Sequence, residues 1–226
     1  MLSNKVINKS INAPNLVNFL KSLILLMKPR VMSLVVFTSA VGLLTSPNTI
    51  PLLNAFMSIF FVTLGAGAAG TLNMWYEADL DKLMTRTCLR PIPTGKINKQ
   101  QALIFGIVLS IISIYGLYYF SNFLSAFLLF VTIAFYLFVY TIWLKRKTPQ
   151  NIVIGGAAGA LPPVIGWTIA TNILTFESIT FFLIIFYWTP SHFWALSLYK
   201  ADDYEKAKIP MLPITNGIQE TKKKIF

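Results

Sequence analysis

The chain has 226 residues, of which 55% are hydrophobic and only 12% charged, and its mean hydropathy is +0.65. These values exclude a soluble globular domain of this length and predict a protein that lies in a lipid bilayer. The single cysteine, Cys88, excludes a disulfide framework and any multi-cysteine metal or iron–sulfur site.

Six transmembrane helices are predicted, after a polar N-terminal tail over residues 1–22 that lacks a signal-peptide pattern. The uncharged runs of the sequence divide at turn residues into segments of about 20 residues, the length that crosses a bilayer. In chain order the expected spans cover residues 30–44, 50–72, 101–120, 123–144, 152–173 and 179–198, with turns at 46–48, 121–122 and 171–172. Glycines in the fifth span predict a close approach of neighbouring helices.

The basic residues set the orientation of these spans. The net charge is +11, and all 19 Lys and Arg fall in the two tails or in the loops between spans 2 and 3 and spans 4 and 5. This bias predicts a multi-pass protein of the cell inner membrane with both termini in the cytoplasm, or of the mitochondrial inner membrane with both in the matrix. The same bias explains the basic run at 145–147. The bilayer is therefore the expected partner of this charge, and nucleic acid is not.

Most of the acidic residues gather in two groups on this same basic side. One group follows span 2 and the other follows span 6, so both face one aqueous surface. The first consists of Glu77, Asp79 and Asp81, and the second of Asp202, Asp203 and Glu205.

The spacing of the first group predicts a metal site. On a helix that continues out of span 2, Asn73, Glu77 and Asp81 fall within about 80° of arc, whereas Asp79 points the other way. Like charges at i and i+4 repel each other, so this stripe calls for a cation. Oxygen ligands without Cys or His suit Mg²⁺, which commonly takes one or two carboxylates and leaves positions for water and substrate phosphate.

Three bases follow the first acidic group at four-residue steps: Lys82, Arg86 and Arg90. Guanidinium and ammonium groups bind phosphate oxygens, so acids and bases together would suit a metal-bridged diphosphate. The same charges also fit salt bridges on a solvated helix end, for example between Asp79 and Lys82. The charge pattern alone leaves both interpretations open.

Two motifs resemble a known family. The pattern formed by Asn73, Glu77 and Asp81, continued by RTCLRPIP at 86–93, resembles the first aspartate-rich motif of the UbiA superfamily of intramembrane prenyltransferases. The segments KPRV at 28–31, NMWY at 73–76 and MTRT at 84–87 are similar, more narrowly, to its protoheme IX farnesyltransferase (heme O synthase) branch. PSHFWAL at 190–196 and DDYEKAKIPMLP at 202–213 resemble the second motif of that branch. The resemblance covers residues 22–220.

The resemblance implies an all-α, polytopic transmembrane bundle, with one domain over residues 1–226 and cytoplasmic motif-bearing segments at 73–99 and 199–226. Members of the branch transfer the farnesyl group of farnesyl diphosphate to a vinyl group of heme B and yield heme O, which links them to heme A synthase and to terminal oxidase assembly. The implied cofactor is Mg²⁺. Its implied ligands are Asn73, Glu77, Asp81, Asp202 and Asp203.

The resemblance also implies roles for single residues. Asp81 and Asp203 are expected to be catalytic, because a metal held by both acidic groups would neutralise the leaving diphosphate. The expected diphosphate ligands are Lys82, Arg86 and Arg90. His192, the only histidine, lies near the end of span 6; it would either line the heme pocket or be hydrogen-bonded within the bundle.

The sequence departs from the family in two ways. Glu77 stands where the family usually has Asp, and the six spans fall short of the family's nine, so a chain of six spans is expected to insert without efficient catalysis. Two alternatives remain: a UbiA-type transferase for an aromatic or quinone precursor, which the second motif disfavours, and an inactive truncated fragment. A transporter would show charges within the spans and an inverted repeat, and the sequence shows neither.

Overall fold

The computed structural model describes residues 16–225, which fold into helices and contain no β-strand. In chain order these are α1 (Leu16–Leu26), α2 (Pro29–Leu44), α3 (Leu52–Tyr76), α4 (Ala78–Asp81), α5 (Lys99–Phe120), α6 (Phe123–Ala134), the π-helix η1 (Phe135–Leu144), α7 (Asn151–Ala160), α8 (Pro162–Thr171), α9 (Phe176–Tyr199), α10 (Ala201–Lys206), α11 (Leu212–Thr215) and α12 (Gly217–Ile225).

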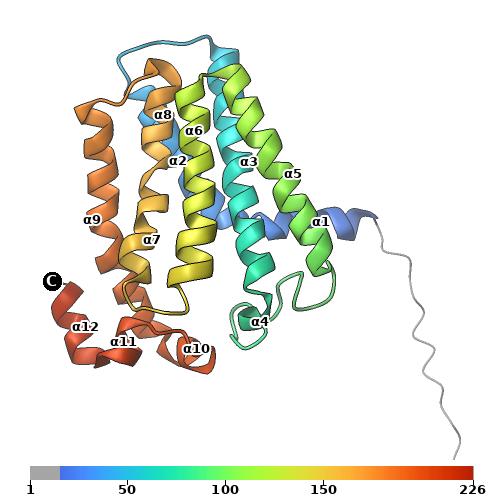
Figure 1. Cartoon of the computed structure of the whole chain (residues 1–226), viewed down its shortest axis with the longest axis vertical. Helices are drawn as coiled ribbons and strands as arrows, with labels where there is room; N and C mark the ends of the chain where they lie inside the picture. The colour runs from blue at the N-terminus through green and yellow to red at the C-terminus, as the bar shows by residue number, and fades with distance from the viewer. Residues whose placement is uncertain (1–15, 226) are drawn as a thin grey trace, which may run out of the picture.

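Five segments are long and apolar enough to cross a membrane: α3, α5, α6 with η1, α7 with α8, and α9. α1 and α2 form a sixth candidate, bent by 54°. The spans run side by side, with turns at one end and α4 and α10–α12 at the other (Figure 1). Five of the six predicted spans are confirmed, with ends that differ by a few residues. The first, predicted at 30–44, coincides with α2, which forms a candidate span only together with α1. The expected tail 1–22 overlaps α1 from Leu16 onward, and its first 15 residues lie outside the described part.

Asparagine and proline residues define several helix ends. The side-chain oxygen Oδ1 of Asn98 accepts a hydrogen bond from the backbone N–H of Gln101 at 2.7 Å and so caps the start of α5, while Asn122 caps α6 in the same way. Asn172 ends α8 in the left-handed conformation, with φ of +55°. α7 and α8 are separated at Leu161, because the two prolines that follow lack an N–H and cannot continue the hydrogen-bond ladder.

Small residues bring α2 and α8 into backbone contact. A Cβ added at Gly42 would lie 2.0 Å from the carbonyl oxygen of Pro163, and one added at Gly166 would lie 1.9 Å from that of Ser39. Such close backbone packing stabilises helix association in lipid, because moving an apolar side chain from lipid into a helix interface gains little free energy. The close packing predicted for the fifth span is thus confirmed.

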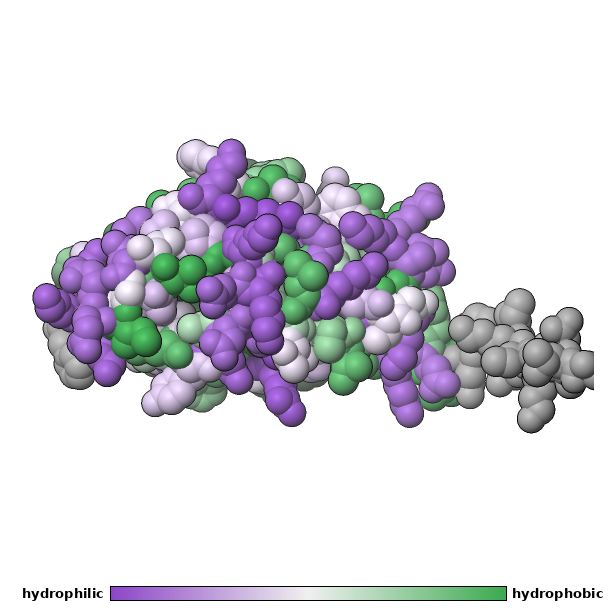
Figure 2. Space-filling view, turned by 90° about the horizontal axis from the view of Figure 1, so that it is seen from below, coloured by the Kyte–Doolittle hydropathy of each residue, from purple (hydrophilic) through white to green (hydrophobic). Residues whose placement is uncertain are grey.

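The bundle has an apolar core and an apolar outer surface, as a bilayer requires. Its largest buried cluster joins α3, α5, α6, η1 and α8 and contains Val62, Leu72, Leu117, Leu129, Ile133, Leu137, Ile165 and Ile169. On α9, large apolar residues such as Ile184 and Trp188 face outward. Figure 2 looks onto the end that carries α4 and α10–α12, where hydrophilic residues cover most of the face. This polar end contains both acidic groups.

Candidate functional site

The first acidic stripe lies at the junction of α3 and α4. The backbone keeps helical hydrogen bonds across the junction, from the Glu77 amide to the Asn73 carbonyl and from the Asp81 amide to the Glu77 carbonyl, both at 2.9 Å. The three side chains therefore share one face, as the spacing predicted. All three residues are buried, with at most 2% of their surface exposed.

Each residue of the stripe contacts a base. The Lys28 ammonium, at the bend between α1 and α2, donates a hydrogen bond to the Asn73 amide oxygen. Lys145, directly after η1, forms an ion pair with Glu77. Nη1 of Arg90 lies 2.8 Å and 2.9 Å from the two carboxylate oxygens of Asp81. Two of these three bases come from segments far away in the sequence.

The π-helix η1 contributes the side chains that lie opposite the stripe. Its wider turn lets the Thr141 hydroxyl donate to the Tyr136 carbonyl, five residues earlier, at 2.8 Å, while that hydroxyl accepts a hydrogen bond from Nδ2 of Asn73 at 3.0 Å. Tyr136 and Tyr140 stack with ring centroids 5.3 Å apart. The ammonium of Lys145 lies 5.7 Å from the Tyr140 ring centre. Aromatic faces, an amide and a base thus meet beside Glu77.

The electrostatics of Glu77 favour its ionised form. Burial alone would raise the pKa of this carboxyl group, but the ammonium groups of Lys145 and Lys28 outweigh burial and hold the pKa below its usual value. The site therefore holds a buried carboxylate whose charge depends on neighbouring cations.

Asp79 points away from the stripe, as the spacing predicted. Its two oxygens each accept a hydrogen bond from the Arg146 guanidinium, both at 2.9 Å, and the Arg146 guanidinium also lies 5.0 Å from the Tyr76 ring centre. The pairing of Asp79 with Lys82 that we considered is therefore wrong, because the two-pronged Arg146 group competes for the same carboxylate. Lys145 and Arg146 of the basic run at 145–147 thus each form an ion pair with an acid of the first group.

The second acidic group is connected to the loop that follows α4. The carboxylate of Asp203 accepts a hydrogen bond from the Thr85 amide at 3.2 Å, while Asp202 is exposed. Arg86 donates to the Tyr204 hydroxyl at 3.1 Å, and its guanidinium lies 5.1 Å from the centre of the Tyr204 ring. These contacts bring the two sequence motifs together at one end of the bundle.

The predicted diphosphate ligands are distributed over this end. Arg90 forms an ion pair with Asp81, Arg86 donates a hydrogen bond to Tyr204, and Lys82 is exposed. Lys28 and Lys145 were not among the predicted site residues, although both lie at span ends on the basic side. The only signal was their position opposite an acidic group, and the orientation bias of membrane proteins produces the same pattern.

The oxygen donors of the first stripe fit Mg²⁺ by their chemistry. Between residues 16 and 225, no three Asp, Glu, His or Cys side chains are close enough to form a metal site made by protein alone. Mg²⁺ does not require one, because it commonly binds through one or two carboxylates together with water and phosphate oxygens. Asn73, Glu77 and Asp81 can supply such a partial set.

His192 lies on the exposed side of α9. Its ring stacks on Trp188 with centroids 4.3 Å apart and meets the edge of Phe193 at 5.4 Å. His192 thus contacts two aromatic side chains of its own helix, and its expected role in a heme pocket stays a prediction.

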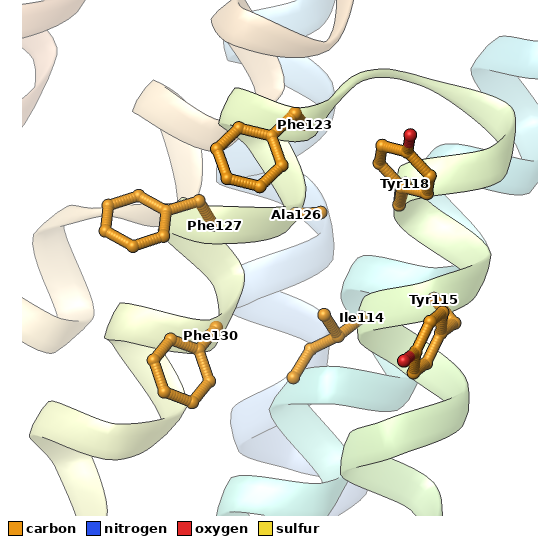
Figure 3. A pocket seen from close by; sticks show the side chains of 7 residues that line it. All are labelled: Ile114, Tyr115, Tyr118, Phe123, Ala126, Phe127 and Phe130. Atoms are coloured by element: carbon orange, nitrogen blue, oxygen red, sulfur yellow. The ribbon is translucent and has the colours of Figure 1, made fainter.

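A separate apolar cavity lies between α5 and α6, next to the turn at 121–122, and has a volume of about 410 Å³. Figure 3 shows Tyr115 and Tyr118 of α5 opposite three phenylalanines of α6. The lining consists of Ile114, Tyr115, Tyr118, Phe123, Ala126, Phe127 and Phe130. None of these residues belongs to the acidic motifs.

Comparison with known proteins agrees with these motifs. The profile of the UbiA prenyltransferase family matches residues 34–226. The chain is 70% identical over 222 residues to the protoheme IX farnesyltransferase of Pelagibacter ubique, covering 98% of this chain and 73% of that protein. It is 59% identical over 201 residues to protoheme IX farnesyltransferase 2 of Mesorhizobium japonicum, covering 89% of this chain and 64% of that protein.

Solved structures share the fold. A UbiA homolog from Archaeoglobus fulgidus bound to DMAPP and Mg²⁺ superposes with a TM-score of 0.72 at 17% identity, covering 90% of this chain and 72% of that one. A structure of a digeranylgeranylglyceryl phosphate synthase gives a TM-score of 0.74 at 19% identity, covering 92% and 72%. With the sequence matches, these likenesses confirm the predicted resemblance: the chain belongs to the UbiA prenyltransferase family, and its curated relatives are protoheme IX farnesyltransferases.

Proposed function

We propose that this chain carries the diphosphate-binding site of an enzyme that transfers the farnesyl group of farnesyl diphosphate to a vinyl group of heme B. Diphosphate leaves, water adds to the vinyl group as hydroxyl, and the product is heme O. The names of its curated relatives support this acceptor, and the second motif favours it over an aromatic or quinone precursor. Relatives in the same fold bind a prenyl diphosphate together with Mg²⁺, which supports the donor and the cofactor.

The observation that carries the proposal is the set of buried acid–base contacts. Glu77 faces Lys145, and Asp81 faces Arg90, with both carboxylates almost fully buried. Removing one partner of a buried ion pair leaves an uncompensated charge and is strongly unfavourable. A ligand can open these contacts at low cost only if it offers a cation to the acids and an anion to the bases. A magnesium diphosphate does both.

In this proposal the residues that would hold Mg²⁺ are Asn73, Glu77, Asp81, Asp202 and Asp203. When bound, the ion would supply positive charge to the leaving diphosphate. The basic side chains would bind the diphosphate oxygens through charge-assisted hydrogen bonds and so stabilise the negative charge of the leaving group. These basic residues are Lys28, Lys82, Arg86, Arg90 and Lys145.

The protein also protects the reactive carbon from water. The stripe is buried, and the stacked pair of Tyr136 and Tyr140 lies beside Lys145, where the end of a prenyl diphosphate would bind. Aromatic faces attract a developing allylic cation, and a closed site keeps water from it. We propose that this pair forms the wall next to the first carbon of the farnesyl chain.

The acceptor and the setting complete the proposal. Heme B would approach from the membrane along α9, where His192 and its aromatic neighbours Trp188 and Phe193 are the candidate contact residues. The polar end would face the cytoplasm of an inner-membrane protein, or the matrix of a mitochondrion. Heme O released there would pass to heme A synthase and to the assembly of terminal oxidases.

Binding and turnover test different parts of the proposal. The chain is reconstituted in lipid nanodiscs and titrated with farnesyl thiolodiphosphate, a slowly reacting analogue, with and without Mg²⁺. We expect saturable binding that needs Mg²⁺, is lost in Asp81→Ala and is kept in Glu177→Ala, because Glu177 lies at the opposite end of the bundle. Binding that ignores both Mg²⁺ and Asp81→Ala would refute the site.

Turnover is tested in a chimera in which residues 16–225 replace the matching part of the Pelagibacter ubique relative. It is expressed in bacteria without heme O synthase, and extracted hemes are separated by chromatography. We expect heme O with the wild-type segment and none with Asp81→Ala. A prenylated quinone precursor in place of heme O would favour the alternative acceptor.

A further inference from the structure

α1 runs across the direction of the spans, beside the half of the bundle that ends in α4 and above the lower ends of α3 and α5 (Figure 1). The sequence encodes the bend that turns it. Lys28 has φ of +55° and ψ of 63°, and Pro29 begins α2. A residue before proline avoids the helical conformation, so α1 cannot continue straight into α2. The two helix axes consequently meet at 54°.

One face of α1 is fixed to the protein. Leu26 is completely buried, and Phe19 and Leu23 pack against the same cluster. The other members of the cluster come from the polar ends of α3 and α5, from α4 and from the loop before α5: Met74, Trp75, Ala78, Ile92, Ile97, Ala102 and Phe105. α1 is therefore held at the level where these spans leave the membrane.

The remaining surface of α1 is amphipathic. Leu16, Leu20 and Ile24 are 67%, 50% and 57% exposed and, at i, i+4 and i+8, lie within about 80° of arc next to the packed face. Val17, 54% exposed, extends this apolar arc by about 20°. Lys21 and Asn18 lie about 60° and 120° beyond Ile24 and are exposed, with Leu25, 51% exposed, between them. An apolar arc beside an arc that carries the exposed polar side chains is the pattern of a helix that lies in the membrane interface.

We infer that α1 is an in-plane interfacial helix that docks on the leaflet at the basic end of the bundle and binds its anionic headgroups. The apolar arc would enter the acyl boundary, while Lys21 and the exposed Arg30 would face the phosphates. Charge complementarity argues for an anionic surface, because α1 carries no acidic residue.

The depth of α1 agrees with this partner. α2 has 16 residues and so rises about 24 Å, roughly 6 Å less than the roughly 30 Å of a hydrocarbon core. With the far end of α2 at one edge of the core, the bend at Lys28 lies within about 6 Å of the other edge. Trp75, in the cluster under α1, is the residue type that marks the same level. Because Lys28 also contacts Asn73, docking of α1 would fix the position of a base in the proposed site.

Depth measurements test the inference on the whole chain. Nitroxide labels are placed by Leu20→Cys, Ile24→Cys or Asn18→Cys in a Cys88→Ser background, in vesicles of phosphatidylcholine and phosphatidylglycerol. Collisions with oxygen report the acyl region, and collisions with a nickel chelate report water. We expect oxygen to dominate at positions 20 and 24 and the chelate to dominate at position 18.

Each other pattern overturns the inference. Dominance of the chelate at all three positions would place α1 in water, and dominance of oxygen at all three would make it part of a membrane-crossing helix. Dipolar broadening between labels on separate chains would show that a second copy covers the apolar arc.

The anionic headgroup is tested separately. Phosphatidylglycerol is expected to raise the midpoint of thermal unfolding of the wild type, and Lys21→Glu should remove at least half of that rise. Lys222→Glu, an equal charge change on α12, should keep it. If both variants lose the same part of the rise in the unfolding midpoint, the rise depends only on net charge, and the proposed role of Lys21 is refuted.

Discussion

Lys145 forms an ion pair with Glu77 although the two side chains are only 11% and 3% exposed. Their segments are the end of η1 and the junction of α3 and α4, so this contact joins two spans at the proposed site. A pair so poorly solvated has large energetic consequences when one member is removed, because the other keeps its charge without water.

Removal of one partner should therefore destabilise the protein more than removal of both. We expect Lys145→Met to lower the free energy of unfolding by about 3–5 kcal/mol, and the double variant Lys145→Met with Glu77→Gln to recover most of that loss. The measurement is a double-mutant cycle from unfolding in mixed detergent micelles. Additive losses would show that the pair is not coupled.

Activity should require a carboxylate from each of the two acidic groups. In the chimera, we expect Asp81→Ala and Asp203→Ala each to lower heme O formation by at least about 100-fold, as loss of a group that stabilises the leaving charge does. Heme affinity should be largely unchanged.

Asp203→Asn separates the two roles of Asp203. It keeps an oxygen for the Thr85 amide but loses the charge, so it should preserve the loop contact and still lose activity. Wild-type rates in either alanine variant at saturating Mg²⁺ would contradict the two-group assignment, and wild-type rates in Asp203→Asn would leave Asp203 a structural role only.

Much of the fold was predictable because lipid imposes strict rules on sequence. Span length, turn residues and the sidedness of Lys and Arg follow directly from the bilayer, and five of the six predicted spans agree with the structure. The bend at Lys28 and the helical character of residues 16–22 were missed, because α1 is too short and too close to charged residues to resemble a span. Its exposed apolar arc can be recognised only when the structure shows which face of α1 packs against the protein.

The site was predictable in part. Periodicity placed Asn73, Glu77 and Asp81 on one stripe, since local helix geometry alone decides that relationship. Periodicity could not predict that Lys145 and Thr141 contact the stripe from another span. It also could not predict the π-helix that positions these two residues. Long-range pairing depends on how the spans pack, and a single sequence does not specify that packing.

The orientation of the chain can be checked by labelling. We expect single cysteines at Asn48, Asn122 and Asn172, in a Cys88→Ser background, to react with an impermeant maleimide added to intact cells. Cysteines at Lys99 and Lys147 should react only after the membrane is opened. These positions occupy opposite ends of the bundle. The reverse labelling would move the proposed site to the other side of the membrane.

The contact between α2 and α8 yields a matched pair of glycine substitutions in the same broken span. At Gly166 a new Cβ would lie 1.9 Å from the Ser39 carbonyl oxygen, and backbone cannot move aside easily, so Gly166→Ala should destabilise the protein by about 1–3 kcal/mol or more. At Gly159 a new Cβ meets nothing within 4 Å, and alanine restricts the unfolded chain, so Gly159→Ala should be neutral or stabilising by up to about 1 kcal/mol. Thermal unfolding in nanodiscs compares the two variants. Equal midpoints would mean that α2 and α8 do not approach each other at Gly166, because the two substitutions add the same methyl group and differ only in what surrounds it.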